Sequence, residues 1–109
     1  MYDLEFLPTA QQDMSDIAKY INKVLCNPIA AMNTIRRMVA AAEAIQEHPY
    51  SCPAYYPPRE LPFEYRKLSV GNYIMFYRVN EQKKLITIVR VIYAKRDYGS
   101  LLGHFDPAN

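Results

Sequence analysis

This chain of 109 residues has few of the residues that mark a nucleotide cofactor, a metal site or a disulfide framework. Its three glycines, Gly71, Gly99 and Gly103, are too scattered for a glycine loop that binds phosphates. Its two cysteines, Cys26 and Cys52, lie far apart, without metal-ligand spacing and without a second pair. We therefore expect a reduced intracellular protein with no cofactor and no metal.

Long apolar segments and paired histidines are also missing. No apolar run approaches the roughly 20 residues that a membrane helix needs. Asp3 and Glu5 stand where a signal peptide would carry positive charge. Neither His48 nor His104 has a second ligand residue at metal-binding spacing, and an isolated histidine is more often a surface residue. We expect a cytoplasmic protein that makes no contact with a membrane.

The composition suits one small folded unit with unevenly placed charge. Apolar residues make up half of the chain, so residues 1–109 should form a single domain with one core, with a loose tail at residues 103–109. Residues 1–58 hold four Lys/Arg against six Asp/Glu, whereas residues 59–98 hold nine against four, a net charge of +5. The second half is therefore suited to nucleic acid or an acidic partner, although solvated strand faces give the same pattern.

The first half of the chain predicts a strand and two helices. Residues 2–6 alternate in polarity and precede Pro8, which is typical of a short strand. Thr9 and Gln12 fit a capping box at the start of one helix. Asn27-Pro28 fits the cap and first residue of the next helix, which should end near His48-Pro49. The short link between the two helices predicts an antiparallel hairpin.

Apolar residues recur at helical spacing in both helices and predict one buried stripe on each. Cys26, at the end of the first helix, is expected in or near the core. The stripes comprise Met14, Ile17, Ile21, Val24 and Leu25, then Met32, Ile35, Val39, Ala42 and Ile45.

A stiff proline-rich loop at residues 48–62 precedes three segments rich in β-branched and aromatic residues. Short turns join these segments and force antiparallel pairing. Asp97 fits the cap of a last short helix at residues 98–102. The three strands are expected at residues 63–69, 72–79 and 85–93, with turns at Gly71 and at residues 80–83.

The predicted fold is α+β, in the order β-α-α-β-β-β-(α). An antiparallel sheet of the last three strands plus the N-terminal strand packs on the helix hairpin. Residues 74–77 are all apolar, so that strand has apolar side chains on both faces. The second face of the sheet must then be covered by the C-terminal segment or by a partner.

Cations and tyrosines are interleaved along the three predicted strands. Arg and Lys can hold phosphates, tyrosines can stack on bases, and together they can stabilise a phosphoryl transition state without a metal. The alternative is that the tyrosines are half-buried strand residues and the cations protect strand edges. The cations are Arg66, Lys67, Arg78, Arg90, Lys95 and Arg96, and the tyrosines are Tyr65, Tyr73, Tyr77, Tyr93 and Tyr98.

Arg90 has a structural alternative of its own. If it shares a face with Ile88 and Ile92, it is partly buried and needs a carboxylate partner. That partner could be Glu64 or an acidic side chain of another protein.

Five segments of this chain resemble the RelE/ParE superfamily of toxins from type II toxin–antitoxin systems, which includes ParE-like plasmid stabilisation proteins. The resemblance covers nearly the whole chain and implies the same order of elements. It also implies a growth-inhibiting toxin that a cognate antitoxin holds silent in a hetero-oligomer. The segments are residues 16–21 and 27–31 in the helices and residues 65–68, 72–79 and 90–102 in the strands.

Members of the superfamily have one of two activities, and residues of this chain can be compared with the pattern of the RelE-like members. RelE-like members cut mRNA in the ribosomal A site with basic residues on the sheet and a C-terminal tyrosine or histidine. ParE-like members poison DNA gyrase. Lys67 and Arg96 stand where RelE-like members carry basic residues. Ile74 stands where RelE-like members carry an arginine, and Leu102 aligns near their C-terminal catalytic tyrosine.

These departures argue against the nuclease but do not identify the target. Our hypothesis is a non-enzymatic toxin with DNA gyrase as its target. The alternative is a metal-independent, ribosome-dependent mRNA endonuclease that uses Lys67, Arg96 and either Tyr98 or His104. A third interpretation is an inactive toxin that still binds its antitoxin. The residues expected to bind the target or the antitoxin are Arg66, Lys67, Ile74, Phe76, Arg78, Lys95 and Arg96.

Overall fold

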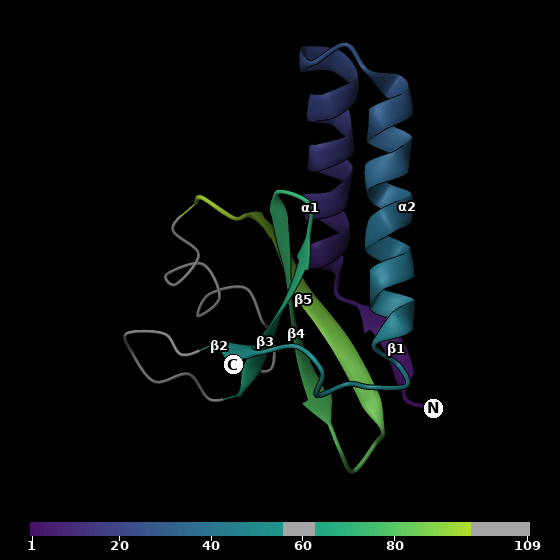
Figure 1. Ribbon diagram of the computed structural model, residues 1–109, viewed down its shortest axis with the longest axis vertical. Helices are drawn as coiled ribbons and strands as arrows, with labels where there is room; N and C mark the ends of the chain where they lie inside the picture. The colour runs from purple at the N-terminus through teal and green to yellow at the C-terminus, as the bar shows by residue number, and fades with distance from the viewer. Residues whose placement is uncertain (56–62, 97–109) are drawn as a thin grey trace.

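The computed structural model describes residues 1–55 and 63–96, in which a helix hairpin packs on one face of a five-stranded sheet (Figure 1). This architecture confirms the predicted α+β fold. The helix expected at residues 98–102 and the tail at 103–109 lie outside the described residues. The elements are β1 (Asp3–Phe6), α1 (Pro8–Lys19), the π-helical turn η1 (Tyr20–Val24), α2 (Pro28–Ala44), β2 (Ala54–Tyr55), β3 (Tyr65–Val70), β4 (Tyr73–Asn80) and β5 (Leu85–Tyr93).

The strands lie in the order β1-β5-β4-β3-β2. β3, β4 and β5 are antiparallel, as their short turns predict, and Gly71 forms the β3–β4 turn with φ of 57°. β1 instead pairs in parallel with β5, because the helix hairpin returns the chain to the same end of the sheet. The sequence did not predict β2, whose two residues are too few to show an alternating pattern.

Beyond the end of β1, side chains of α1 form hydrogen bonds with the backbone of β5. The Thr9 hydroxyl donates a hydrogen bond to the carbonyl oxygen of Val89 at 2.9 Å, and Asp13 accepts one from the Val91 N–H at 2.9 Å. The predicted capping box is therefore wrong. The helix begins at Pro8 without a side-chain cap, because the Thr9 hydroxyl is engaged with the sheet.

α2 begins as predicted. The Asn27 side chain accepts a hydrogen bond from the Ala30 N–H at 3.0 Å, and Pro28 is the first helical residue. The helix ends at Ala44, a turn earlier than expected. No helix in the described ranges is long and apolar enough to cross a bilayer.

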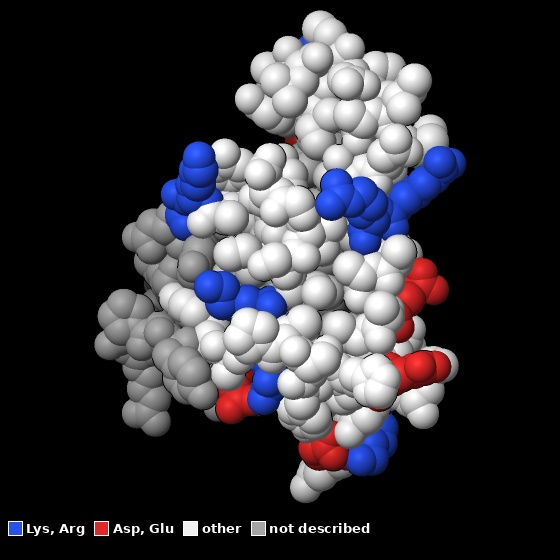
Figure 2. Space-filling model, in the orientation of Figure 1, with Lys and Arg blue, Asp and Glu red and all other residues white. Residues whose placement is uncertain are grey.

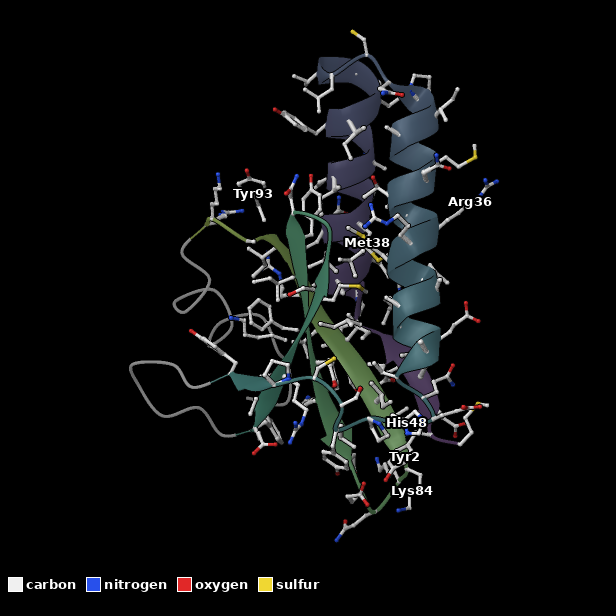
Figure 3. The ribbon with its side chains drawn as sticks, in the orientation of Figure 1. Tyr2, Arg36, Met38, His48, Lys84 and Tyr93 are labelled. Atoms are coloured by element: carbon white, nitrogen blue, oxygen red, sulfur yellow. The ribbon has the colours of Figure 1, made fainter. Side chains whose placement is uncertain are left out.

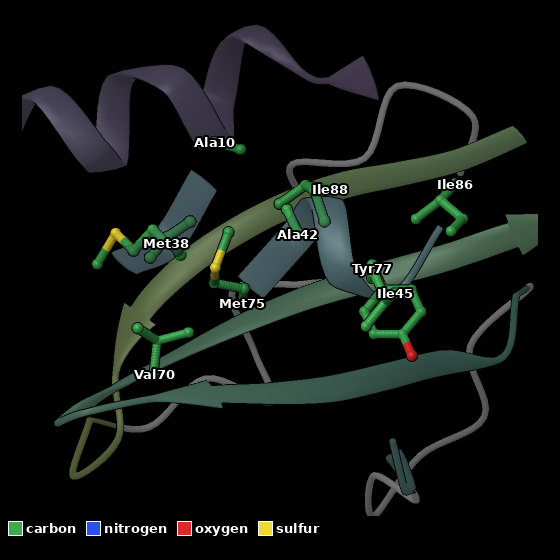
Figure 4. Close-up of a cluster of buried hydrophobic side chains, with 10 residues drawn as sticks. Ala10, Met38, Ala42, Ile45, Val70, Met75, Tyr77, Ile86 and Ile88 are labelled. Carbon is green, nitrogen blue, oxygen red and sulfur yellow. The ribbon is translucent and has the colours of Figure 1, made fainter. Parts of the chain in front are cut away.

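Two apolar clusters lie on opposite faces of the sheet. The larger fills the space between the hairpin and the sheet, where Met38 and Ala42 of α2 meet Met75 and Tyr77 of β4 (Figure 4). Each large side chain buried there contributes roughly 1.5–3 kcal/mol of hydrophobic free energy. The second cluster lies on the face away from the helices, called here the second face, and its buried members are Tyr65, Ile74, Phe76, Val89 and Ile92.

Candidate functional site

The predicted basic residues do not form one cluster. Lys95 and Arg96 are exposed and follow Tyr93, which pairs with Tyr73 beside the β3–β4 turn. Arg66 lies toward the opposite end of the sheet, where it pairs with Tyr77. A single phosphate group therefore cannot contact both groups of cations.

Arg66 is engaged within the fold. Its guanidinium donates hydrogen bonds to the Glu64 carboxylate at 2.8 Å and to the carbonyl oxygen of Cys52 at 2.7 Å. The same group lies 4.8 Å from the ring centre of Tyr50. These contacts hold the loop after α2 against β3, so Arg66 has a structural role.

Arg78 comes close to Arg66, which the sequence did not indicate. Its guanidinium lies 5.0 Å from the ring centre of Phe63, a cation–π contact. The two arginines border a pocket of about 270 Å³ that Tyr50, Glu64 and Phe63 also line.

Ile74 and Phe76 were predicted to contact a partner, but both belong to the core. Ile74 is 6% exposed and Phe76 is fully buried in the cluster of the second face. A partner that docks on this conformation meets neither side chain. The apolar residues on both faces of β4 were predicted, and both sets are buried in the structure.

The candidate nuclease residues are only partly within the described ranges. Lys67 is half-buried on β3 and Arg96 is exposed beyond β5. Tyr98 and His104 lie outside the described residues. At the centre of the second face, Ile74 and its neighbours form an apolar cluster, and the buried members of that cluster other than Tyr65 have no side-chain group that could take or give a proton.

Arg90 forms a two-point ion pair with Asp13 of α1. Its Nε lies 2.6 Å from Oδ2 and its Nη2 lies 2.9 Å from Oδ1, and the side chains are only 10% and 14% exposed. A bulge at Val89 shifts the register here, so Ile88 and Ile92 point to opposite faces. The structural interpretation of Arg90 is therefore favoured, with Asp13 as the carboxylate in place of Glu64.

Glu81, in the β4–β5 turn, binds two tyrosines from distant parts of the chain and the nearby Lys84. Its Oε1 accepts hydrogen bonds from the hydroxyls of Tyr2 and Tyr50, the latter at 2.7 Å, and its Oε2 lies 3.0 Å from Lys84 Nζ. Figure 3 shows Tyr2 and Lys84 side by side near the foot of the hairpin. The hydrogen bonds from Tyr2 and Tyr50 lower the pKa of Glu81 to about 2.

The hairpin extends well past the end of the sheet (Figure 1). Its distal part, called here the hairpin tip, comprises residues 20–32. Val24, Leu25 and Met32 were predicted in buried stripes, yet they are 63%, 56% and 55% exposed. The prediction is wrong there because no strand lies beneath the tip, and because η1 has the wider π-helical turn, which rotates the following side chains.

Other residues of the tip are exposed as well. Tyr20 is 51% and Ile29 is 73% exposed. Cys26, expected in or near the core, is also exposed, because it forms the connection between the helices with φ of 51°. Tyr20 lies near Tyr73, whose pKa is raised first by burial and then by Tyr20.

The cations of the hairpin have no acidic partner among the residues that the structure describes. Within residues 1–55 and 63–96, no ion pair or side-chain hydrogen bond involves Lys19, Lys23, Arg36 or Arg37. Figure 2 shows a largely uncharged knob at the end of the hairpin, with Lys and Arg below it and most of the visible Asp and Glu in the lower half.

Two open grooves run beside the hairpin. The first has a volume of about 360 Å³ and the second about 440 Å³. The first lies where β1 meets the helices, and the second lies between the helices next to the tip. Their lining residues include Leu4, Phe6, Met14 and Val39 in the first, and Ala18, Lys19, Ala31, Met32, Ile35 and Arg36 in the second.

Solved structures of bacterial toxins share this arrangement. The chain is similar to a toxin–antitoxin structure described as the chromosomal ParDE system of P. aeruginosa, with 23% identity, a TM-score of 0.69, and coverage of 87% of this chain and 98% of the other. It is also similar to the RelBE2 complex of Mycobacterium tuberculosis, with 19% identity, a TM-score of 0.58, and coverage of 84% and 96%. Isolated RelE toxin of E. coli gives 17% identity, a TM-score of 0.53, and coverage of 94% and 96%.

These likenesses place the fold among toxins of the RelE/ParE type. Residues 4–98 match the profile of a family described as the ParE toxin of the type II toxin–antitoxin system parDE. The chain therefore belongs to the ParE toxin family, as the sequence resemblance predicted. No curated protein sequence gives a significant match.

Proposed function

We propose that this toxin inhibits growth by binding its target rather than by cutting RNA, and that the target is DNA gyrase in the cytoplasm. The observation that carries the proposal is the apolar centre of the second face. Ile74, with 6% exposure, fills the place of an arginine in the RelE-like pattern. A missing cation at a phosphate typically costs about 3–4 kcal/mol of transition-state stabilisation. Membership of the ParE family supports gyrase as the target.

The proposed antitoxin occupies the two grooves beside the hairpin. Four of the six residues lining the first groove and four of the eight lining the second are apolar, which suits an amphipathic helix or an extended segment. Their positions on two sides of α1 and α2 favour an antitoxin that wraps around the hairpin. The resulting toxin–antitoxin hetero-oligomer would keep the toxin silent.

The mRNA endonuclease remains the second candidate, because Lys67 and Arg96 are the two RelE-like basic positions that this chain retains. The test is expression of the toxin without its antitoxin, followed by a supercoiling assay with purified gyrase and by mapping of mRNA ends. We expect inhibited supercoiling, cleaved DNA complexes and intact mRNA.

Variants separate the two activities. Codon-phased mRNA cuts that disappear in Arg96→Ala and persist in Lys83→Ala, a control at an exposed turn residue, would overturn the binding proposal. Normal growth during expression of folded toxin would instead leave an inactive toxin that binds only its antitoxin. Inhibited supercoiling by both variants is the result we expect.

A further inference from the structure

The hairpin tip presents apolar side chains that the fold does not use. Val24, Leu25 and Ile29 are 63%, 56% and 73% exposed, and they lie in consecutive turns around the connection between the helices. None of the three belongs to either buried cluster. Exposed apolar patches of this kind on a small protein usually mark a surface that binds another molecule.

The surroundings of the tip define the charge of its partner. Residues 14–41 of the hairpin contain Lys19, Lys23, Arg36 and Arg37 against the single acid Asp16. Asp16 accepts a hydrogen bond from Gln12 at 2.9 Å, and no described side chain forms an ion pair with any of the four cations. An apolar centre within a cationic rim complements an apolar cleft within an acidic rim.

We infer that the hairpin tip is the part of the toxin that inserts into its target protein, in an apolar cleft bordered by Asp and Glu side chains. This inference rests on the proposed function, in which the toxin acts by binding a protein. It assigns the contact to Val24, Leu25 and Ile29, with Lys23 and Arg36 steering the approach.

The proposed contacts of the target and the antitoxin are adjacent and share Arg36. Val24, Leu25 and Ile29 line neither groove, whereas Lys19, Met32 and Arg36 line the groove next to the tip. An antitoxin segment in that groove lies against the tip and excludes the target by its bulk. Neutralisation then needs no change in the shape of the toxin.

A nucleic acid fits the tip less well than a protein does. Phosphates would contact the cations, but the three aliphatic side chains offer no stacking surface for bases. A protein cleft buries these side chains and pairs the cations at its rim. The protein target is therefore the occupant that the structure favours.

The main test compares the double variant Leu25→Gln/Ile29→Gln with the wild-type toxin in the gyrase supercoiling assay. Ala40→Gln, at an exposed position on α2 outside the tip, is the matched control. We expect the double variant to need at least tenfold more protein for half-inhibition, with the control unchanged. Equal inhibition by the double variant and the wild type would overturn the inference and leave the proposed function intact.

A second variant tests the rim and guards against loss of folding. Circular dichroism first establishes that each variant is folded. Lys23→Glu/Arg36→Glu should weaken inhibition severalfold at low salt and approach the wild type at high salt, because screening removes the charge effect. If the charge variant loses inhibition and the Gln variant keeps it, a polyanion is the ligand and the protein-cleft inference is wrong.

Two further outcomes distinguish the inference from the proposed function. If wild-type toxin leaves gyrase unaffected, the gyrase proposal fails, and growth inhibition by the double variant then decides the role of the tip. Retained growth inhibition overturns the inference, and lost inhibition supports it for another target. If the double variant inhibits gyrase normally but escapes the antitoxin, the tip binds the antitoxin and the inference is wrong.

Discussion

The base and the tip of the helix hairpin have similar apolar residues at helical spacing but opposite surroundings. At the base, Ala10, Met38 and Ala42 are fully buried against the sheet, and Asp13 is bonded to β5. At the tip, Leu25 and Ile29 are more than half exposed. The base holds the fold together, and the tip leaves its side chains available to a partner.

This difference also separates the charges. In the first 58 residues the sequence has a net negative charge, with six acids against four cations. All four cations lie between residues 19 and 37, while Asp3 and Glu5 lie on β1, Glu43 lies in the last turn of α2 and Glu47 follows it. The helix hairpin therefore carries cations at and below its tip, in a half of the chain that is acidic on average.

The largest expected effect is at the base, in the ion pair between Arg90 and Asp13. Asp13→Asn leaves the guanidinium buried without a countercharge, so we expect a loss of about 3–5 kcal/mol in the free energy of unfolding. Urea denaturation measures it. Asp16→Asn, an exposed position on the same helix, should change the free energy by less than about 0.5 kcal/mol. Equal losses in both variants would contradict the structural role of the pair.

Two methionines on α2 differ in burial, because one lies at the base and the other lies in the tip. Met38 is fully buried and Met32 is 55% exposed. Met38→Ala should lower the free energy of unfolding by about 2–5 kcal/mol through lost burial and a cavity. Met32→Ala should change it by less than about 0.5 kcal/mol. A similar cost at both positions, again in urea, would show that the tip is packed in solution.

The Glu81 cluster at the base should make stability depend on pH. The folded-state pKa of about 2 lies below the ordinary value of 4.5, so ionised Glu81 stabilises the fold above pH 4.5. This contribution is lost as the pH falls from 4.5 toward 2. We expect Glu81→Gln to lower Tm at pH 7 and the difference from wild type to shrink over that interval. A difference that stays constant from pH 7 to 2 would rule out the linkage.

The smallest effect on stability is expected at the tip itself. Leu25→Gln/Ile29→Gln replaces side chains that are already largely in water, so the free energy of unfolding should change by less than about 0.5 kcal/mol. Thermal unfolding followed by circular dichroism measures this change. A large drop in Tm would mean that the tip supports the fold, and the contrast between base and tip would then be lost.

Much of the fold was predictable because local patterns and global packing agree. The strand at residues 85–93 was predicted with the observed bounds, since β-branched residues there are bounded by turn residues. Asn27-Pro28 also began its helix as predicted. The site was less predictable. Arg66 and Arg78 line one pocket, while Lys95 and Arg96 lie at the other end of the sheet.

The sequence by itself determined the order of the elements other than β2, the antiparallel pairing across short turns and the family, because these depend on residues close together in the chain. The tertiary structure alone decided the parallel pairing of β1 with β5, the partner of Arg90 and the exposure of the hairpin tip. An apolar stripe in the sequence indicates that a helix can bury one of its faces. Whether Leu25 and Ile29 are covered depends on how far the sheet extends beneath them, and that is set by contacts between residues far apart in sequence.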